Sequence, residues 1–482
     1  MNIGERELTL LCDFYELTMA RGYFHSDIKD QVAYFDVFFR RVPDGGGYAI
    51  FAGLEQIIEY IKSIKFTAED IEYLRSKGIF DEDFLSYLKA FRFTGDIWSV
   101  EEGTVVFPNE PIMTVRAPAI EAQFIETFVL LVINHQCLIA TKASRITRSA
   151  KGRPVSEFGA RRAHGADASI YGARASYIGG CASTSCAIAD KLFGVKAGGT
   201  MAHSWIQMFD SEYEAFETYC RLYPDNPTLL VDTYDVIKSG IPNAIKAFKS
   251  CLTEEQQKSC GIRIDSGDIT YLTKKARKML DNAGLTGCKI VISNSLDEYI
   301  IRDILTQGAC IDAFGVGERL VTARSEPVFG GVYKLCAIEK DGKIIPKIKI
   351  SENPIKITNP DFKNLYRFYS KETGKAEADL ITLYDEVIDE SQPYELFDPA
   401  HIWKRKTMTN YTLKSLRKRI FENGVCVYTS PSVDKIRERC ERELASMWDE
   451  VLRLDNPHAY YVDLSQALWD EKNKLLSKKG SM

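Results

Sequence analysis

One histidine lies in a stretch whose composition suits the handling of phosphate. This residue is His203, in the run Gly198-Gly-Thr-Met-Ala-His-Ser204, and an amphipathic segment follows from Trp205. Paired glycines let the backbone approach a ligand closely, Ser204 is a suitable helix cap, and a helix N-terminus attracts phosphate. A neutral imidazole there can be a nucleophile toward a phosphoryl group or a general base. The motif fits equally well a histidine packed in a turn.

A second segment could bind the anionic and flat parts of a substrate. It reads Glu157-Phe-Gly-Ala-Arg-Arg162 and follows a short strand expected over 153–156. An arginine there can hold phosphate or carboxylate bidentately, and Phe158 can stack on a flat ring. Adjacent strand side chains point to opposite faces, so at most one of the two arginines should face a site. The alternative is a strand end with solvated arginines.

A third segment combines a cation with a carboxylate, in the order Arg263-Ile-Asp-Ser-Gly-Asp268. Period-two alternation sends Arg263 and Asp265 to one side of a strand. A carboxylate there can hold ribose hydroxyls or a Mg²⁺-bound pyrophosphate, and the turn at Ser266 offers backbone donors. The alternative is that Asp265 or Ser266 caps the next helix. Gly315-Val-Gly317, after another strand, is a small candidate phosphate cradle.

Repeated strand–helix units must position these residues. Short apolar strands, each with polar or glycine residues at its end, are expected over 228–232, 261–265, 289–293 and 311–315, and helices over 235–248, 268–283 and from Leu296. Apolar strands that alternate with helices predict buried parallel strands. In a parallel α/β barrel the carboxyl ends of the strands carry the chemistry, as they do in a doubly wound sheet. The contents of the motifs favour the barrel.

The flanking regions have a different organisation. Before the repeated units we expect a helix over 8–24, a strand over 32–39, helical periodicity over 53–93, β character over 101–115 and a helix over 122–149; after them we expect strands over 333–337 and 344–350 and charged helices over 432–454 and 463–478. The length exceeds what one core supports. We predict an α/β protein with an N-terminal α+β domain (1–140), an irregular α/β barrel (141–340) and a C-terminal α/β extension with terminal helices (341–482).

Composition narrows the class of protein. The 482 residues carry a net charge of −5, so there is no basic field that would suit nucleic acid. Twelve scattered cysteines without Cys-x-x-Cys spacing give little support to a zinc or iron–sulfur site and suit a reducing cytosol. The N-terminus lacks a targeting signal, and the apolar run over 128–133 is too short to span a bilayer. We expect a cytoplasmic protein without a membrane segment.

Taken in order, the motifs resemble those of the ATP-coupled nicotinate phosphoribosyltransferases. The matching segments are Asp13-Phe-Tyr-Glu-Leu-Thr-Met19, Glu157-Phe-Gly-Ala-Arg161, Gly198-Gly-Thr-Met-Ala-His-Ser204, Val231-Asp-Thr-Tyr-Asp235, Arg263-Ile-Asp-Ser-Gly-Asp268, Ile292-Ser-Asn294 and Phe314-Gly-Val-Gly317 through Gly330-Gly-Val-Tyr-Lys334. Several motifs in register from Asp13 to Lys334 are far more specific than any one of them.

The resemblance implies a fold, an assembly and a reaction. The fold is that of a type II phosphoribosyltransferase, in head-to-tail homodimers with active sites at the subunit interface. Nicotinate, phosphoribosyl pyrophosphate, ATP and water give nicotinate mononucleotide, pyrophosphate, ADP and phosphate, the first step of NAD salvage from nicotinate. ATP is a cosubstrate, Mg²⁺ accompanies the pyrophosphate, and no metal site made of protein ligands alone is implied.

The resemblance also assigns roles to residues. His203 matches the histidine that ATP phosphorylates, and Asp265 matches a carboxylate at the reacting sugar. The other implied contacts are Tyr15 of the partner chain and Phe158 around the pyridine ring, Arg161 near the ring and pyrophosphate, Thr200 and Arg263 on nicotinate, Asp265, Ser266 and Gly267 on ribose and pyrophosphate, and Gly315, Gly317 and Thr322 at the 5′-phosphate.

Two departures from the family pattern bear on the substrate. Cys181-Ala182 replaces a frequent Phe-Asp pair, and no carboxylate lies between Gly179 and Ala189, where nicotinamide-using relatives carry one. This favours an acid substrate. Glu318 follows Gly-Val-Gly where threonine is frequent, and its carboxylate would repel a phosphate unless it is turned away.

Four other readings remain open. Nicotinamide phosphoribosyltransferase has the same chemistry with another base, and competition between nicotinate and nicotinamide separates the two. Quinolinate phosphoribosyltransferases are shorter and lack the histidine step. A non-catalytic barrel would bind nucleotides without turnover. A metal-dependent aldolase-type barrel would need a carboxylate–histidine cluster, which the motifs do not contain.

Overall fold

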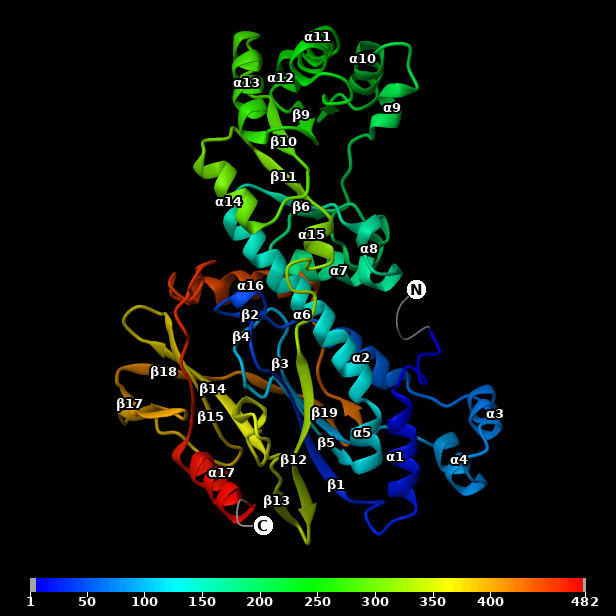
Figure 1. Cartoon of the computed structure of the whole chain (residues 1–482), viewed down its shortest axis with the longest axis vertical. Coiled ribbons are helices and arrows are strands. Elements are labelled where there is room, and N and C mark those ends of the chain that lie inside the picture. Colours follow the sequence, from blue (N-terminus) through cyan, green and yellow to red (C-terminus); the bar gives the residue numbers. More distant parts are fainter. Residues whose placement is uncertain (1–5, 480–482) are drawn as a thin grey trace. The chain divides into compact units, whose positions relative to one another are not determined.

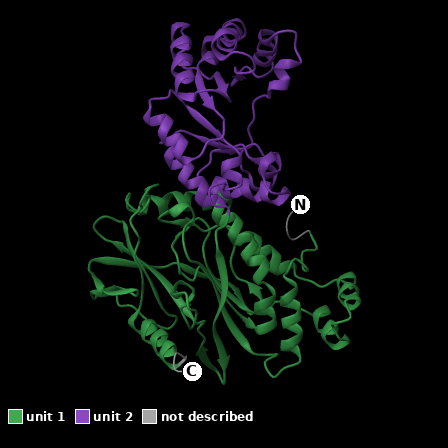
Figure 2. Ribbon diagram, viewed as in Figure 1, with its two compact units in different colours: residues 1–138, 328–482 green, residues 139–327 purple. Residues whose placement is uncertain are grey.

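The computed structural model describes residues 6–479. The first five residues, part of the stretch expected to lack a targeting signal, and residues 480–482 lie outside the described residues. Two compact units divide the chain (Figure 2). Unit 1 contains residues 1–138 and 328–482, and unit 2 contains residues 139–327. Unit 2 is therefore inserted in sequence between the two halves of unit 1.

Unit 2 is built on a six-stranded parallel sheet in the order β7-β6-β11-β10-β9-β8. The strands are β6 (Val155–Glu157), β7 (Ser183–Thr184), β8 (Thr228–Leu230), β9 (Gly261–Ile264), β10 (Lys289–Ile292) and β11 (Ala313–Val316). The mixed α/β class with a parallel core is confirmed. Within residues 6–479 the end strands β7 and β8 do not pair, so hydrogen-bonded strands do not close a ring.

Helices follow the strands of unit 2. They are α7 (Ala166–Ile178), α8 (Ala187–Phe193), α9 (His203–Gln207), α10 (Glu212–Leu222), α11 (Ile241–Cys251), α12 (Glu254–Gln257), α13 (Ile269–Asn282), α14 (Glu298–Thr306) and α15 (Glu318–Val321). Aspartates cap two of them: Asp268 accepts from Tyr271 N at 2.7 Å, and Asp297 accepts from Ile300 N at 2.9 Å. These caps fix where each strand-end loop turns into its helix.

Unit 1 contains a seven-stranded antiparallel sheet in the order β13-β12-β1-β5-β3-β19-β20 (Figure 1). Its strands are β1 (Val32–Phe39), β3 (Asp96–Val100), β5 (Met113–Pro118), β12 (Gly331–Lys340), β13 (Lys343–Pro346), β19 (Arg417–Glu422) and β20 (Val425–Cys426). Both halves of unit 1 supply strands, because β1 pairs with β12 and β3 pairs with β19.

Unit 1 has further strands, most of which the sequence did not predict; the strand Val105–Val106 lies inside the β stretch expected over 101–115. A four-stranded sheet has the order β18-β14-β15-β21, and two ribbons pair β16 with β17 and β2 with β4. The strands are β2 (Ala49–Ile50), β4 (Val105–Val106), β14 (Lys363–Ser370), β15 (Ala376–Leu383), β16 (Tyr394–Asp398), β17 (His401–Met408), β18 (Tyr411–Ser415) and β21 (Val462–Leu464).

The helices of unit 1 agree in part with expectation. They are α1 (Phe14–Phe24), α2 (Leu54–Ser63), α3 (Ala68–Ser76), α4 (Glu82–Lys89), α5 (Ala119–Phe124), α6 (Glu126–Ser149), which continues into unit 2 from Ile139, α16 (Val433–Ser446) and α17 (Gln466–Lys479). The helix expected over 8–24 begins only at Phe14, with Asp13 as its N-cap residue. Helix α5 packs against α1, β1 and β5.

One helical stretch is long and apolar enough to cross a membrane by length and composition alone. It covers Ala119–Ser149, and 67% of its most apolar window is buried inside the protein. A core helix of a soluble protein has the same properties, and this degree of burial is typical of one.

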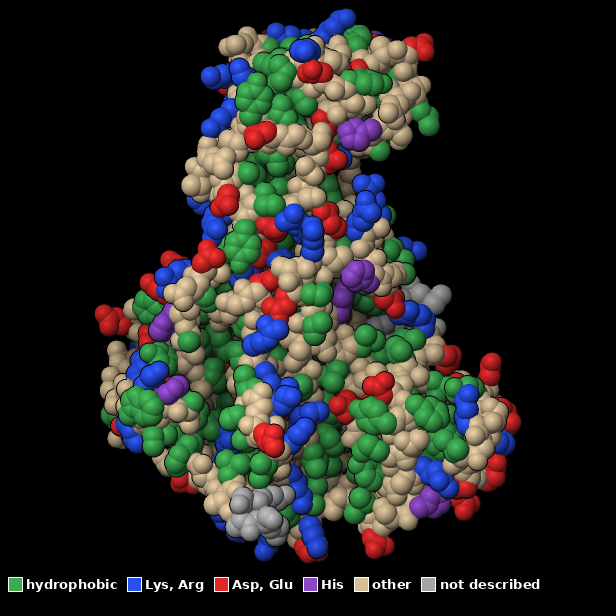
Figure 3. Space-filling view, viewed as in Figure 1, with side chains coloured by type: hydrophobic (Ala, Val, Ile, Leu, Met, Phe, Trp, Pro, Cys, Tyr) green, Lys and Arg blue, Asp and Glu red, His purple; other side chains and the backbone are tan. Residues whose placement is uncertain are grey.

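On the face drawn in Figure 3, positive and negative side chains are interspersed.

Candidate active site

Arg263 connects three segments of unit 2. From β9, its Nη1 donates to Thr200 Oγ1 at 2.7 Å and to the Met201 carbonyl at 3.1 Å, and its Nε donates to Ser293 Oγ at 2.8 Å. The side chain is only 15% exposed. The guanidinium therefore fixes the Gly-Gly-Thr loop against the ends of β9 and β10.

Asp265 follows β9 directly and faces the same network. Its Oδ1 accepts from Ser293 Oγ at 2.6 Å and lies 3.6 Å from Arg263 Nη2. Its Oδ2 lies 3.9 Å from His203 Nε2. Arg263 and Asp265 thus share one side of the strand, as period-two alternation predicts. Asp268 caps α13, so neither Asp265 nor Ser266 is needed as a cap.

His203 is the first residue of α9. Its N-cap residue is Ala202, which offers no side-chain cap, so the expectation that Ser204 caps this helix is wrong. The His203 Nδ1 lies 3.1 Å from Thr233 Oγ1, and Nε2 points toward Asp265. The side chain is 41% exposed. One ring nitrogen is oriented by a hydroxyl, while the other can be reached by a ligand.

Asp232 supports the loop that carries Asp265. Its Oδ2 accepts from the Asp265 backbone N at 3.0 Å and from Ser266 Oγ at 2.6 Å. Its Oδ1 is buried and has no hydrogen-bond partner among the described residues. Sequence reasoning placed Asp232 at a strand end but gave it no role. The signal was present, since it follows β8 as Asp265 follows β9.

Phe158 explains the two glycines after β11. A Cβ on Gly315 would lie 2.4 Å from Phe158 Cδ2, so only glycine leaves room for the ring. A Cβ on Gly317 would lie 3.1 Å from the Phe158 carbonyl oxygen, and Phe158 N donates to Val316 O at 2.8 Å. The glycines therefore seat the Phe158 turn beside β11. A phosphate contact at Gly315 and Gly317 stays a prediction.

Glu157 holds the same turn from beneath. It is 1% exposed, its Oε2 accepts from Thr184 Oγ1 at 2.7 Å, and its Oε1 accepts from the Gly159 backbone N. Burial raises the pKa of the Glu157 carboxyl. The motif reading named Glu157 without a role, and the structure gives it a positioning one.

The two arginines after Phe158 do not lie on a strand. Strand β6 ends at Glu157, and Ala160–Arg162 form a 3-10 turn, so the alternation argument does not apply to them. Arg161 and Arg162 are both exposed, and within residues 6–479 neither guanidinium group has a hydrogen-bond or ion-pair partner. Both guanidinium groups are available to an anion.

The segment after Gly317 is already partly engaged. Thr322 Oγ1 donates to the Glu318 carbonyl at 2.6 Å, which uses its hydroxyl proton within the helix end. Arg319 pairs with Asp297. Gly267 has φ +84°, a conformation that favours glycine, so the turn after Asp265 depends on it. Thr322 as a phosphate ligand stays a prediction.

Tyr15 belongs to the other unit. It lies in the first turn of α1 and is 45% exposed. Partial burial and the nearby carboxylates of Glu126 and Glu16 raise the pKa of its phenol, which therefore stays neutral. The remaining predicted site residues all lie in unit 2.

Unit 2 thus gathers a guanidinium, two carboxylates, an exposed imidazole nitrogen and an aromatic ring at the ends of its parallel strands. A guanidinium binds a carboxylate or phosphate, and carboxylates bind sugar hydroxyls or a hydrated divalent cation. An accessible imidazole can accept a phosphoryl group. These are the groups that a phosphorylated sugar and an aromatic acid require.

Family models match along most of the chain. The nicotinate phosphoribosyltransferase (NAPRTase) N-terminal domain matches residues 10–134, the NAPRTase family matches 154–373, and the nicotinate phosphoribosyltransferase C-terminal domain matches 362–472.

Individual relatives agree with these matches. Nicotinate phosphoribosyltransferase of Bacillus subtilis (strain 168) is 45% identical over 465 residues, which cover 96% of this chain and 94% of that protein. The Caenorhabditis elegans enzyme of that name is 34% identical, with 95% and 92% covered. The crystal structure of human nicotinic acid phosphoribosyltransferase superposes with a TM-score of 0.84 at 27% identity, covering 97% of this chain and 100% of that one.

Proposed function

The chain belongs to the nicotinate phosphoribosyltransferase family, and from this premise we propose that it couples transfer of the phosphoribosyl group to ATP through a phosphohistidine at His203. Its activity is that of a nicotinate phosphoribosyltransferase: nicotinate and phosphoribosyl pyrophosphate give nicotinate mononucleotide and pyrophosphate, in the biosynthesis of NAD. The observation that carries the ATP-coupled mechanism is the accessible Nε2 of His203 beside Asp265.

Arg263 and Thr200 are the groups that we assign to the carboxylate of nicotinate. Arg263 Nη1 donates to Thr200 Oγ1, so the two groups lie together, and a carboxylate beside both would accept a charge-assisted bond from the guanidinium and a bond from the hydroxyl. The 179–189 stretch contains no acidic residue that would select an amide. Phe158 would cover one face of the pyridine ring, with Arg161 near the ring and pyrophosphate. The proposal therefore favours nicotinate over nicotinamide.

Asp265 and Asp232 are assigned to the sugar and to Mg²⁺. The unpartnered, buried Oδ1 of Asp232 fits a cation or its water shell, since a carboxylate oxygen in this setting normally has a partner. Mg²⁺ would neutralise the departing pyrophosphate. Asp265, with Ser266 and Gly267, would hold ribose and tolerate the positive charge that develops at the anomeric carbon. The pyridine nitrogen is a free nucleophile at pH 7, so catalysis needs positioning more than a base.

His203 would take the γ-phosphoryl group of ATP. The bond between the γ-phosphorus and its bridging oxygen breaks, a bond from Nε2 to phosphorus forms, and ADP leaves with that oxygen. Thr233 orients the ring through Nδ1, which leaves Nε2 for this attack. Later attack of water on the phosphorus releases phosphate and restores His203. Coupling requires that the phosphohistidine form and the substrates stabilise each other.

The test is labelling with γ-³²P-ATP. We expect acid-labile label on His203, none on His203→Ala, and wild-type labelling of His164→Ala, an exposed histidine of the same unit that serves as the matched control. Nicotinate turnover by His203→Ala should lose its stimulation by ATP. A His203→Ala protein that still takes up label and keeps full ATP stimulation would refute the mechanism.

Assembly and location complete the proposal. We assign the enzyme to the cytoplasm, because none of its twelve cysteines, all within the described residues, forms a disulfide. We assign it a homodimeric state in which Tyr15 of one chain reaches the site of the other; the exposure of Tyr15 on unit 1 supports this.

Competition between nicotinate and nicotinamide for turnover tests the substrate, and a nicotinamide preference would count against the Arg263 assignment.

A further inference from the structure

Unit 1 contains a large cavity that the proposed reaction does not use. Its volume is about 1,020 Å³, and its walls come from the end of β1 and the turn after it, and from the segments 107–111, 354–363, 398–404 and 456–464. Small-molecule sites commonly occupy 300–1,000 Å³. None of the lining residues is among those assigned to nicotinate, phosphoribosyl pyrophosphate or ATP.

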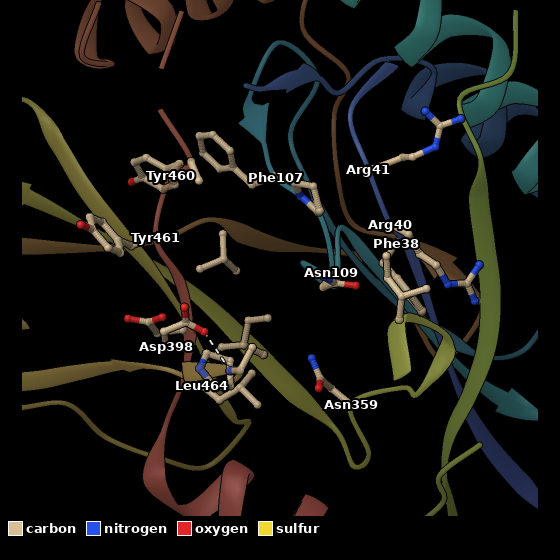
Figure 4. A pocket seen from close by; sticks show the side chains of 18 of the residues that line it. Phe38, Arg40, Arg41, Phe107, Asn109, Asn359, Asp398, Tyr460, Tyr461 and Leu464 are labelled. Carbon is tan, nitrogen blue, oxygen red and sulfur yellow. Dashed lines mark hydrogen bonds between the residues drawn. The ribbon is translucent and has the colours of Figure 1, made fainter. Parts of the chain in front are cut away.

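One side of the cavity is cationic. Arg40 and Arg41 lie there at the end of β1 (Figure 4). The Arg40 Nε is buried without a hydrogen-bond partner among the described residues, and its guanidinium lies 5.7 Å from the Phe38 ring centre. A buried donor of this kind normally has a partner, so an acceptor is missing from this wall.

Two acidic residues of the lining are already paired with cations other than Arg40. Asp36 is held by Lys363 at 2.8 Å, and both are buried. Asp398 is held by His401 at 2.9 Å, with Lys404 at 4.0 Å. The lining is therefore suited to an anion at the Arg40 side.

The opposite side can recognise hydroxyl groups. Asp463, on β21, is 4% exposed and lines the cavity. Burial and the charge of Asp398 raise the pKa of Asp463 to about 7, so near neutral pH it can donate as well as accept. In Figure 4, Asp398 lies across the cavity from Arg40 and Arg41.

Aromatic rings line the cavity on the side of Asp398 (Figure 4). Phe107 and Tyr460 stack with centroids 3.9 Å apart and an interplanar angle of 11°, and the neighbouring Tyr461 is 40% exposed. Figure 4 shows Phe107 and the two tyrosines along one margin of the cavity. An exposed tyrosine ring offers a stacking face to a flat base.

We infer that this cavity is a second, non-catalytic site for a nucleotide. The phosphate would bind at Arg40 and Arg41, the ribose hydroxyls at Asp398 and Asp463, and the base beside Tyr461. Phosphate, ribose and a flat ring are common to adenine and pyridine nucleotides. The site would let nucleotide concentration act on the enzyme apart from its substrates.

The test uses the full-length Arg263→Ala protein, in which the catalytic site is disabled and the cavity is intact. The protein is titrated calorimetrically with AMP, nicotinate mononucleotide, ribose 5-phosphate and inorganic phosphate. We expect at least one of the two nucleotides to bind with a stoichiometry of one per chain. Its affinity should be at least tenfold higher than that of ribose 5-phosphate and of inorganic phosphate. If AMP binds better, the natural ligand is an adenine nucleotide; if nicotinate mononucleotide binds better, it is a pyridine nucleotide.

Cavity variants in the same background locate the binding. Ala459→Trp, on an exposed lining residue, should weaken it at least tenfold, and Lys404→Glu should weaken it severalfold; Ala90→Trp, an exposed control away from the lining, should not. No nucleotide binding, equal affinity for inorganic phosphate, or unchanged binding by a folded Ala459→Trp protein would each overturn the inference. Because catalysis is already disabled, these outcomes are independent of the proposed mechanism at His203.

Discussion

The geometry of Arg263 depends on the shape of a guanidinium as well as on its charge. Two of its nitrogens reach Thr200, the Met201 carbonyl and Ser293 together, which the single ammonium of lysine cannot do. We expect Arg263→Lys to raise the KM for nicotinate by about tenfold to a hundredfold, since a charge-assisted bond contributes about 1.5–3 kcal/mol.

Steady-state kinetics with varied nicotinate measure this effect. Arg277→Lys is the matched control, because Arg277 lies on α13 and bonds the carbonyls of Cys288 and Leu285. If Arg263→Lys left the KM for nicotinate unchanged, Arg263 would not be the carboxylate contact.

Asp232 offers a second test at the scale of one residue. Asp232→Asn keeps the size of the side chain but removes its negative charge. In the wild type this charge is shared by Oδ2, which accepts from the Asp265 backbone N, and by Oδ1, which has no partner among the described residues. We expect kcat to fall by about tenfold to a hundredfold and the Mg²⁺ concentration for half-maximal rate to rise, because a neutral amide is a weaker cation ligand. Rates at varied Mg²⁺ measure both, and a normal Mg²⁺ response would contradict the assignment.

At the scale of the element, Glu16 attaches α1 to the start of α6. It is fully buried, and its Oε1 accepts from Thr127 N at 3.0 Å and Thr127 Oγ1 at 2.7 Å. Burial raises the pKa of Glu16 to about 8, whereas the pKa of a glutamate in the unfolded chain is about 4.3. Between these values the folded state binds the extra proton, so the free energy of unfolding falls as pH rises through this window.

Glu16→Gln should remove this pH dependence. The amide oxygen can still accept from Thr127, and no charge forms at high pH. We expect the unfolding free energy of the variant to gain roughly 1–3 kcal/mol relative to wild type between pH 5 and pH 9. Urea unfolding at several pH values measures it, with the exposed Glu69→Gln as control. Parallel pH profiles of wild type and Glu16→Gln would show that Glu16 is not the titrating group.

The elements differ in how well the sequence predicts them. The strand expected over 261–265 is observed as β9, Gly261–Ile264. It could be predicted because a short apolar run between turn residues is typical of a buried strand in a parallel sheet. Strand β17 was missed: most of His401–Met408 is exposed, and its charged side chains show no alternation, so only its pairing with β16 defines it.

The site shows the same division between local and distant information. Alternation along β9 predicted that Arg263 and Asp265 share a side. No local pattern could show that Thr200 contacts Arg263 across 63 positions, or that Asp232 supports Asp265. The Ser204 cap failed because the helix begins two residues earlier than expected, at His203 instead of Trp205, and end residues depend on loop geometry.

At the scale of the whole molecule, the distribution of site residues bears on the proposed dimer. Tyr15 lies in unit 1, whereas His203, Arg263 and Asp265 lie in unit 2. If Tyr15 acts in the partner's site, a Tyr15→Ala chain paired with a His203→Ala chain forms one site with both changes and one with neither. Equal mixing with full exchange then restores about a quarter of the wild-type sites, because half of the dimers are mixed.

We therefore expect two proteins that each lack ATP-stimulated activity to regain it after subunit exchange, rising toward about a quarter of the ATP-stimulated rate of the wild type. Tagged subunits would confirm that mixed dimers form. The control mixes His203→Ala with Arg263→Ala; both residues lie in unit 2 and would belong to one chain's site, so each site stays defective and no activity returns. If the Tyr15→Ala mixture gave no recovery despite verified exchange, Tyr15 would serve its own chain or no site at all.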